Sequence, residues 1–201
     1  MSQLSFFGAE TMPPALADLS GLLAAHGHVT VTDEGASISV EVEEEWRAAA
    51  VARFVRDTGI DAEVVRDDGL FLVGTATDRL IGTLAAEWTG EEGKTVPTGW
   101  MPTARAQRVW FLAAGRMEVE GAQYVLGLDP VAPGTHGPLA QALLHAGIAP
   151  TLIGTHGTGR PGLRISGRKR LTRFVENIGA PPDADEARRI WPHVEPADHH
   201  L

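Results

Sequence analysis

Two short stretches of the sequence, Leu22–Gly27 (LLAAHG) and Trp110–Gly115 (WFLAAG), align with each other at a separation of 88 residues. Beyond Gly157 the separation grows to 91, which a longer glycine-rich loop in the second copy explains, because loops accept insertions at small cost. A tandem repeat is therefore predicted. Other pairs keep the separation of 88: Ile38 with Leu126, Val40 with Leu128, Val51 with Leu139, Val55 with Leu143, and Gly59 with Gly147.

Each copy shows the same order of hydrophobic periods. In the first copy, leucines at helical spacing run from Pro13 to Gly27, and apolar residues then alternate with polar ones on both sides of a turn at residues 33–35. A second helix is expected over about 44–58, a second hairpin turns at residues 67–69, and a third helix covers about 77–88. The fold class predicted is α+β, with two antiparallel four-stranded sheets backed by helices. The expected boundaries are an N-terminal segment 1–12, a first repeat 13–88, a linker 89–101, a second repeat 102–181 and a C-terminal tail 182–201.

The aligned stretches resemble a known family. Leu19–Gly27 (LSGLLAAHG) resembles the LAGLIDADG motif of homing endonucleases, and Arg108–Arg116 (RVWFLAAGR) is similar to the version in bacterial WhiA regulators. Ile178–Ala180 (IGA) also resembles the close of the WhiA repeat. The resemblance covers residues 13–181 and implies two LAGLIDADG-like α-β-β-α-β-β-α units, with paired motif helices and two saddle-shaped sheets that lie on DNA. Small residues would form the repeat interface by letting the helices approach: Gly21, Ala24, Ala25, Ala113 and Ala114. The alternative is that both motif stretches are ordinary core helices.

The resemblance also bears on catalysis. In active endonucleases the last acidic residue of each motif binds the divalent metal, which prefers carboxylate oxygens. Here those positions are His26 and Ala114, and the motifs' other acidic position is Ala24 in one copy and Leu112 in the other. We therefore expect no enzyme activity, no catalytic residues, no metal and no cofactor. A divergent metal-dependent nuclease remains a third hypothesis. WhiA proteins add a helix-turn-helix domain, for which residues 183–201 are too short, although a short helix is expected at 184–191.

Charge differs between the halves. Residues 1–100 contain 6 basic and 17 acidic side chains, whereas residues 101–201 contain 11 basic and 9 acidic ones. This asymmetry predicts that one half meets an anion and the other does not.

The second copy contains the candidate DNA-binding residues. Its last hairpin alternates Arg164 and Ser166 with apolar residues, and the helix after it begins with basic residues. The sequence favours contact with the phosphates of double-stranded DNA; the alternative is an ordinary solvated basic face. The resemblance to WhiA implies a role in transcription regulation, either by binding DNA or by assisting a regulator. The full set is Arg160, Arg164, Ser166, Arg168, Lys169, Arg170 and Arg173.

The acidic first half supports a second hypothesis. Glu41, Glu43, Glu44 and Glu45 would repel DNA, so they form either a solvated face or a docking surface for a basic protein partner. The chain would then be a protein-interaction module on the same scaffold.

Composition and weaker motifs exclude other classes. The sequence has no cysteine, and no apolar run approaches the ~20 residues of a membrane helix, so we expect a cytoplasmic protein without disulfides or membrane contact. The loop Gly154–Gly159 lacks the Lys-Ser/Thr ending of a phosphate-binding loop. Metal binding by His26 with His28 or by His199 with His200, and a catalytic triad built on His136 or His145, are weaker alternatives.

Overall fold

The computed structural model describes residues 8–156 and 159–195. Its first repeat begins with the 3-10 helix η1 (Leu16–Leu19), which continues directly into α1 (Ser20–Ala24). The carboxylate of Asp18 accepts a hydrogen bond from Ala15 N at 2.9 Å and so fixes this start, three residues after the predicted one. The remaining elements are β1 (His28–Thr32), β2 (Gly35–Val42), α2 (Glu45–Asp57), β3 (Ala62–Asp67), β4 (Leu70–Thr75) and α3 (Arg79–Glu87).

The second repeat follows the same order. It contains α4 (Ala104–Ala114), β7 (Gly115–Val119), β8 (Gln123–Gly127), η2 (Pro133–Thr135), α5 (His136–His145), β9 (Thr151–Ile153), β10 (Gly162–Ser166) and α6 (Arg168–Ile178). Within the predicted linker the structure has a small hairpin of β5 (Thr89–Gly90) and β6 (Gly93–Lys94), and α7 (Asp185–Ile190) lies in the predicted tail.

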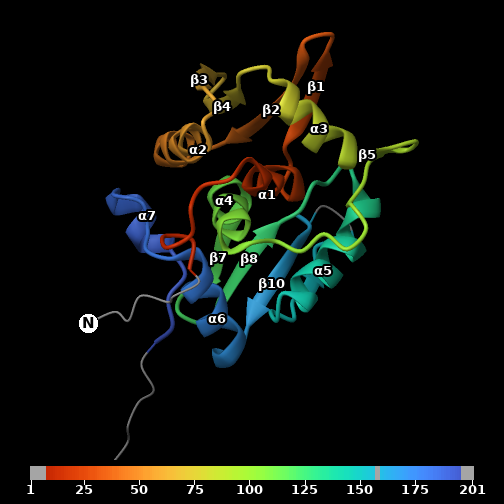
Figure 1. Cartoon of the computed structure of the whole chain (residues 1–201). Coiled ribbons are helices and arrows are strands. Elements are labelled where there is room, and N and C mark those ends of the chain that lie inside the picture. The colour runs from red at the N-terminus through yellow and green to blue at the C-terminus, as the bar shows by residue number, and fades with distance from the viewer. Residues whose placement is uncertain (1–7, 157–158, 196–201) are drawn as a thin grey trace, which may run out of the picture.

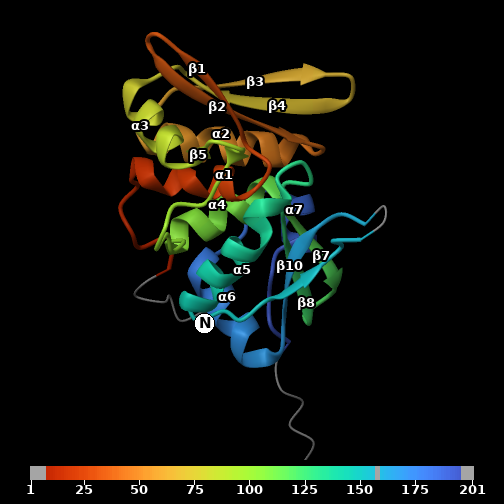
Figure 2. The same ribbon diagram turned by 90° about the vertical axis from the view of Figure 1, so that its right-hand side faces the viewer.

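Two antiparallel sheets of four strands form, in the orders β1-β2-β4-β3 and β7-β8-β10-β9. The equivalent order confirms the predicted fold class. Figure 1 shows the first sheet above and the second below, with α1 and α4 between them. In Figure 2 the β3–β4 and β9–β10 hairpins extend toward the same side of the molecule.

Alternating burial decides which face of each sheet meets the helices. Along β2, Ala36, Ile38, Val40 and Val42 are buried, whereas Ser37 and Ser39 are half-buried and Glu41 is exposed. In β10 the buried side chains that alternate with Arg164 are Leu163 and Ile165. Because successive strand side chains point to opposite faces, each sheet has an apolar inner face under its helices and an outer face of mixed polarity.

One hydrophobic core joins the repeats. The linker residue Trp100 packs edge-to-face against Trp88 of the first repeat, with ring centroids 4.9 Å apart, and lies 6.4 Å from Trp110 of the second. After α7, the Trp191 ring packs at 5.3 Å against Phe111 of α4 and donates a hydrogen bond to Gly179 O. The linker and the segment after α6 are therefore part of the packed fold. In the described part of the chain no helix is both long and apolar enough to cross a membrane.

Candidate nucleic-acid interface

The contact between α1 and α4 sets the position of the two repeats. A Cβ atom on Gly21 would lie 2.2 Å from Ala106 O and 2.5 Å from Val109 Cγ1, so the two backbones approach as closely as glycine allows. Ala24, Ala25 and Ala113 are buried near this contact. Ala114, by contrast, is half-buried and packs against Gly127 of β8.

A buried arginine caps the C-terminal end of α4 by binding its carbonyl groups. Arg47, from α2 of the first repeat, donates hydrogen bonds to Phe111 O and Leu112 O at 2.9 Å and to Gly115 O at 2.7 Å. Its Nε also pairs with Glu44 at 2.9 Å. Burial lowers the pKa of Arg47, and the charge and hydrogen bond of Glu44 oppose that shift. The arginine therefore places a positive charge at the negative end of the α4 dipole.

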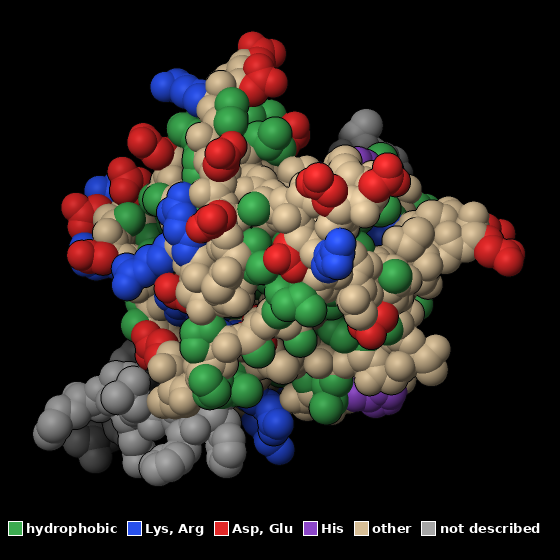
Figure 3. All heavy atoms as spheres, turned by 45° about the horizontal axis from the view of Figure 1, so that its top comes forward, with side chains coloured by type: hydrophobic (Ala, Val, Ile, Leu, Met, Phe, Trp, Pro, Cys, Tyr) green, Lys and Arg blue, Asp and Glu red, His purple; other side chains and the backbone are tan. Residues whose placement is uncertain are grey.

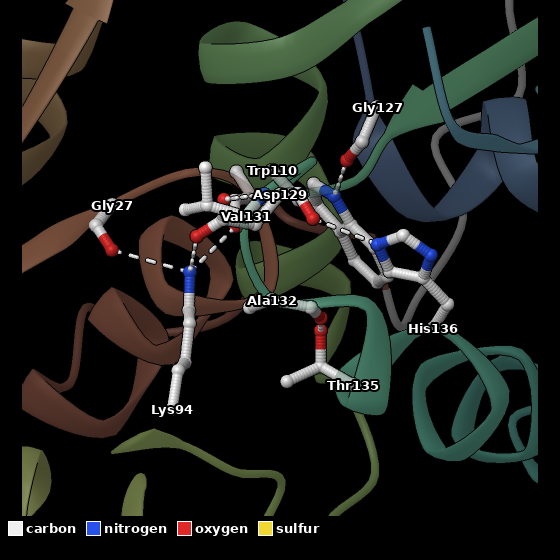
Figure 4. Close-up of polar contacts among 10 residues, drawn as sticks. Gly27, Lys94, Trp110, Gly127, Asp129, Val131, Ala132, Thr135 and His136 are labelled. Carbon is white, nitrogen blue, oxygen red and sulfur yellow. Dashed lines mark hydrogen bonds and ion pairs between the residues drawn. The ribbon is translucent and has the colours of Figure 1, made fainter. Parts of the chain in front are cut away.

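A lysine closes α1 in a comparable way. Lys94 of the linker hairpin donates from Nζ to Ala25 O at 2.9 Å, to Gly27 O at 3.2 Å and to the Asp129 carboxylate at 2.9 Å (Figure 4). Burial lowers the pKa of Lys94, and its hydrogen bond to Asp129 opposes that shift. Asp129 O in turn accepts a hydrogen bond from the buried His136 ring at 2.7 Å. Each motif helix thus ends on a cation supplied from outside its own helix.

The two motif-end residues do not provide metal ligands. His26 donates from Nε2 to Glu41 O at 2.7 Å, and Ala114 has no donor atom in its side chain. The cations Arg47 and Lys94 already lie at the carbonyl ends of both helices, so these positions do not fit a divalent metal. Across residues 8–156 and 159–195 no group of three or more His, Asp or Glu side chains could hold a metal ion. The pair His199 and His200 lies outside the described residues.

Three arginines gather on the outer face of the second sheet. Arg116 of β7 and Arg164 of β10 both pair in register with Val125 of β8, so their side chains share one face. Arg160, in the loop before β10, accepts a hydrogen bond at its carbonyl from Arg116 Nη2 at 3.1 Å. We call Arg116, Arg160 and Arg164 the sheet arginines.

The sheet arginines are only partly neutralised. Glu118 contacts Arg164 at 2.6 Å and Arg116 at 4.0 Å, and Glu43 approaches the exposed Arg160 at 3.9 Å. Burial lowers the pKa of Arg116; the charges of Arg160 and Arg164 add to this shift and Glu118 opposes it. Three neighbouring guanidinium groups share one close carboxylate and one distant one, an arrangement that favours an added anion such as a phosphate.

The predicted basic cluster is divided between two layers. Arg160, Arg164 and Ser166 belong to the strand layer, but the chain enters α6 directly after β10, and Leu171 and Phe174 bury that helix against the core. The other four members are exposed on α6, in the helix layer: Arg168, Lys169, Arg170 and Arg173. The cluster is therefore not one continuous surface.

The outer face of the first sheet has a different chemistry. Register places Glu41, Leu72 and Val65 in one row across β2, β4 and β3, with Glu63 and Asp67 on either side along β3. Leu72 and Val65 are 37% and 52% exposed, so the face is both acidic and apolar. No described Lys or Arg of β1–β4 lies on this face, because Arg66 points to the inner side with Phe71. Figure 3, which brings this end of the molecule forward, shows acidic side chains spread over the surface.

The four glutamates predicted as a possible docking surface, Glu41, Glu43, Glu44 and Glu45, do not all face solvent freely. Glu41 is exposed on the outer face of the first sheet, and Glu45 is exposed in the first turn of α2. Glu44 holds Arg47, and Glu43 approaches Arg160. Two of the four therefore take part in contacts with the protein's own arginines.

Sequence reasoning missed Arg116, Arg47 and Lys94 as functional residues. Arg116 could have been found, because the repeat alignment places it at the start of a strand in the same sheet as Arg164. The other two contact carbonyl groups 64–69 residues away, and carbonyl acceptors occur at every position of a sequence. Such contacts have no signal in residue spacing.

The fold of this chain is similar to that of several proteins of known structure. No family model matches the sequence, and no curated protein matches it. The N-terminal LAGLIDADG domain of DUF199/WhiA is similar in structure, with a TM-score of 0.59 and 13% identity over 94% of this chain and 97% of that one. The homing endonuclease I-WcaI, solved bound to its DNA recognition sequence, has a TM-score of 0.58 and 12% identity over 94% of this chain and 88% of its own.

Full-length DUF199/WhiA from Thermatoga maritima is also similar, with a TM-score of 0.58 and 16% identity. The match covers 86% of this chain and 57% of that protein. At identities of 12–16% these similarities establish the fold, and they confirm the resemblance found in the sequence.

Proposed function

From the LAGLIDADG fold of this chain, we propose that it is a non-catalytic DNA-binding protein, with a transcription-regulator-like role, which contacts DNA through the outer face of its second sheet. The proposal rests on two features observed together. The sheet arginines lie on the second sheet, and the C-terminal ends of α1 and α4 are capped by Lys94 and Arg47. The first supports phosphate contacts, and the second argues against metal-dependent cleavage at the ends of the motif helices.

The sheet arginines support DNA contact. Arg164 is half-buried on the sheet surface, and Arg160 is exposed in the loop before β10, where its carbonyl group contacts Arg116. Arginine binds phosphate oxygens with a planar set of donors, and such contacts position a protein on DNA without reading its sequence. The acidic outer face of the first sheet would repel the same duplex. We therefore propose that DNA binds mainly to the second repeat.

The helix ends support the absence of cleavage. Hydrolysis of a phosphodiester by a metal-dependent nuclease needs carboxylates that bring a divalent cation to the phosphate. At the motif ends this chain has an imidazole bonded to Glu41 O and an alanine, flanked by the cations Arg47 and Lys94. A second cation at these ends would meet like charge.

The first prediction concerns the salt dependence of DNA binding. We expect the double variant Arg160→Gln/Arg164→Gln to bind random-sequence duplex DNA more weakly than wild type. Because each neutralised phosphate contributes about 0.9 to the slope of log K against log salt, that slope should fall by about 2. Fluorescence anisotropy at several salt concentrations measures both quantities.

Arg168→Gln/Lys169→Gln is the matched control, because it removes the same charge from the helix layer. We expect it to change the slope by less than the sheet variant does. Equal effects of the two pairs would contradict contact through the second sheet. No binding of the wild type even at low salt would contradict DNA binding itself.

The second prediction concerns cleavage. Incubation of a supercoiled plasmid with the wild-type protein and millimolar Mg²⁺ or Mn²⁺ should leave it supercoiled on an agarose gel. Nicking or linearisation that depends on the metal and persists through purification would contradict the non-catalytic proposal and support the divergent nuclease.

The outer face of the first sheet favours one alternative function, a protein-interaction module. Its exposed Leu72 and Val65, between acidic residues, border an open hollow of about 440 Å³ that Asp61 and Glu63 also line. Acidic and apolar groups together suit a basic, partly apolar protein surface rather than a phosphate backbone. Absence of DNA binding in the anisotropy experiment would favour this alternative.

A further inference from the structure

A cleft lies between the repeats on the side where α2 passes α4. One stripe of α2 lines it with Trp46, Ala49, Ala50, Arg53 and Asp57, which are spaced as one helical face. The facing stripe of α4 provides Arg105, Arg108 and Leu112. Residues 9–10 and 181–184 also line this open cleft, whose volume is about 670 Å³. We call this space the α2–α4 cleft.

Arg105 lines this cleft and contains a buried donor without an acceptor. Its Nε donates to the Asp18 carboxylate at 3.0 Å and its Nη1 to Ala9 O at 3.3 Å. Its Nη2 is buried and has no hydrogen-bond partner in the described part of the protein. The residue as a whole is only 8% exposed. The guanidinium also stacks over Phe54 at 4.6 Å. An unpaired buried donor is costly, which makes it a sign of a missing acceptor.

Two further arginines converge on the same space. Arg108 donates from Nη1 to Ile178 O at 2.5 Å and to Ala180 O at 2.6 Å, and it stacks on Trp191. Arg53 is exposed and makes no hydrogen bond or ion pair within the described residues. Burial lowers the pKa of Arg108; the charges of Arg105 and Arg53 add to this shift and Glu10 opposes it. Arg108 is therefore repelled by the guanidinium groups of both Arg105 and Arg53.

The carboxylates at the cleft do not fully neutralise these arginines. Glu10 accepts a hydrogen bond from Ala180 N at 3.1 Å, and Asp183 is paired with Arg188 outside the cleft. Asp57 is exposed at the far end of the α2 stripe. A bound anion would satisfy Arg105 Nη2 and reduce the repulsion among the arginines.

We propose that the α2–α4 cleft binds a phosphorylated small molecule of about nucleotide size, with its phosphate on Arg53, Arg105 and Arg108 and its ring against the apolar wall. The volume lies in the range of ligand pockets, roughly 300–1,000 Å³, and exceeds what a phosphate alone would fill. The wall available to a ring consists of Trp46, Ala49, Ala50, Leu112 and Pro181.

This ligand site is separate from the proposed DNA interface. The cleft arginines belong to α2 and α4, whereas the sheet arginines belong to β7, β10 and the loop between β9 and β10. Failure of one proposal therefore leaves the other intact.

The third prediction tests this site by isothermal titration calorimetry of the whole protein without nucleic acid, using AMP, adenosine and inorganic phosphate. We expect AMP to bind more tightly than either fragment. Arg53→Gln should weaken AMP binding about tenfold, because it removes a charge-assisted contact from an exposed residue without other partners. Because a ligand of the folded state stabilises it, AMP should also raise the melting temperature of the wild type.

Arg79→Gln is the matched control, since Arg79 is an exposed arginine on α3, away from the cleft, and its loss should leave AMP binding unchanged. DNA binding by Arg53→Gln should equal that of the wild type. Equal binding of adenosine and AMP would overturn the anion site, and equal binding of phosphate and AMP would overturn the ring contact. Absence of binding by all three probes at millimolar concentration, or an Arg53→Gln variant that binds AMP as the wild type does, would overturn the proposal as a whole.

Discussion

Replacing Gly21 by alanine is expected to destabilise the protein by about 1–3 kcal/mol, although the same change in an unobstructed helix would be stabilising. The added Cβ would lie 2.2 Å from Ala106 O and 2.5 Å from Val109 Cγ1, and the first of these is a backbone atom that cannot rotate away. The α1–α4 contact would have to open, and the apolar groups packed around it would lose contacts. Urea denaturation gives the difference in unfolding free energy.

Gly82→Ala in α3 is the matched control. There a Cβ would meet its nearest atom, Gly35 Cα, at 3.6 Å, which is ordinary van der Waals contact. This variant should be unchanged or gain up to about 1 kcal/mol from helix propensity. If Gly21→Ala were as stable as Gly82→Ala, the close approach of the two motif helices would not be what fixes the repeats.

Replacing Arg47 by methionine is expected to cost about 3 kcal/mol or more. The change removes two hydrogen bonds to carbonyl groups of α4 and one to Gly115 O directly after it. Phe111 O keeps its hydrogen bond from Gly115 N, but Leu112 O and Gly115 O each lose a donor. Because the Arg47 side chain is only 7% exposed, water cannot readily take its place. The methionine retains much of the apolar volume, so the loss reports the polar contacts rather than a cavity. Chemical denaturation followed by circular dichroism measures the change.

Arg56→Met provides the comparison for Arg47. Arg56 lies on the same helix, is exposed and donates one hydrogen bond to Ala62 O at 2.6 Å. Its loss should cost less than about 1 kcal/mol, as is usual for exposed polar contacts. Similar stabilities of the two variants would show that the closure of α4 by arginine contributes little.

The sheets could be predicted well from the sequence because the two copies align with each other at a nearly constant spacing. Once Leu22–Gly27 is aligned with Trp110–Gly115, each strand of one copy supports the assignment of its equivalent, and the strand orders agree. The first motif helix is less regular than its pattern, because Asp18 is drawn to Ala15 N and to Arg105 rather than to solvent. The hairpin at Lys94 also escaped prediction, since strands of two residues have no period to detect.

The candidate site was predictable only in part. Alternation in β10 correctly separates Arg164 from its buried neighbours, but the run from Arg168 to Arg173 is continuous with it in sequence and belongs to another layer. The α2–α4 cleft could not be found from the sequence either. Its arginines come from helices more than 50 residues apart, and each sits in a stripe that reads as an ordinary helix surface.

The capping of α4 by an arginine from the first repeat has a consequence for synthesis of the chain. Arg47 comes from the first repeat, but the carbonyl groups it binds extend to Gly115 of the second. At about 5–20 residues per second, the ribosome needs about 1–5 seconds to advance from residue 88 to residue 115. During that interval α1, which packs against α4 in the finished protein, has no partner helix. The first repeat therefore leaves the ribosome with its central helix exposed, open to chaperones until the second repeat arrives.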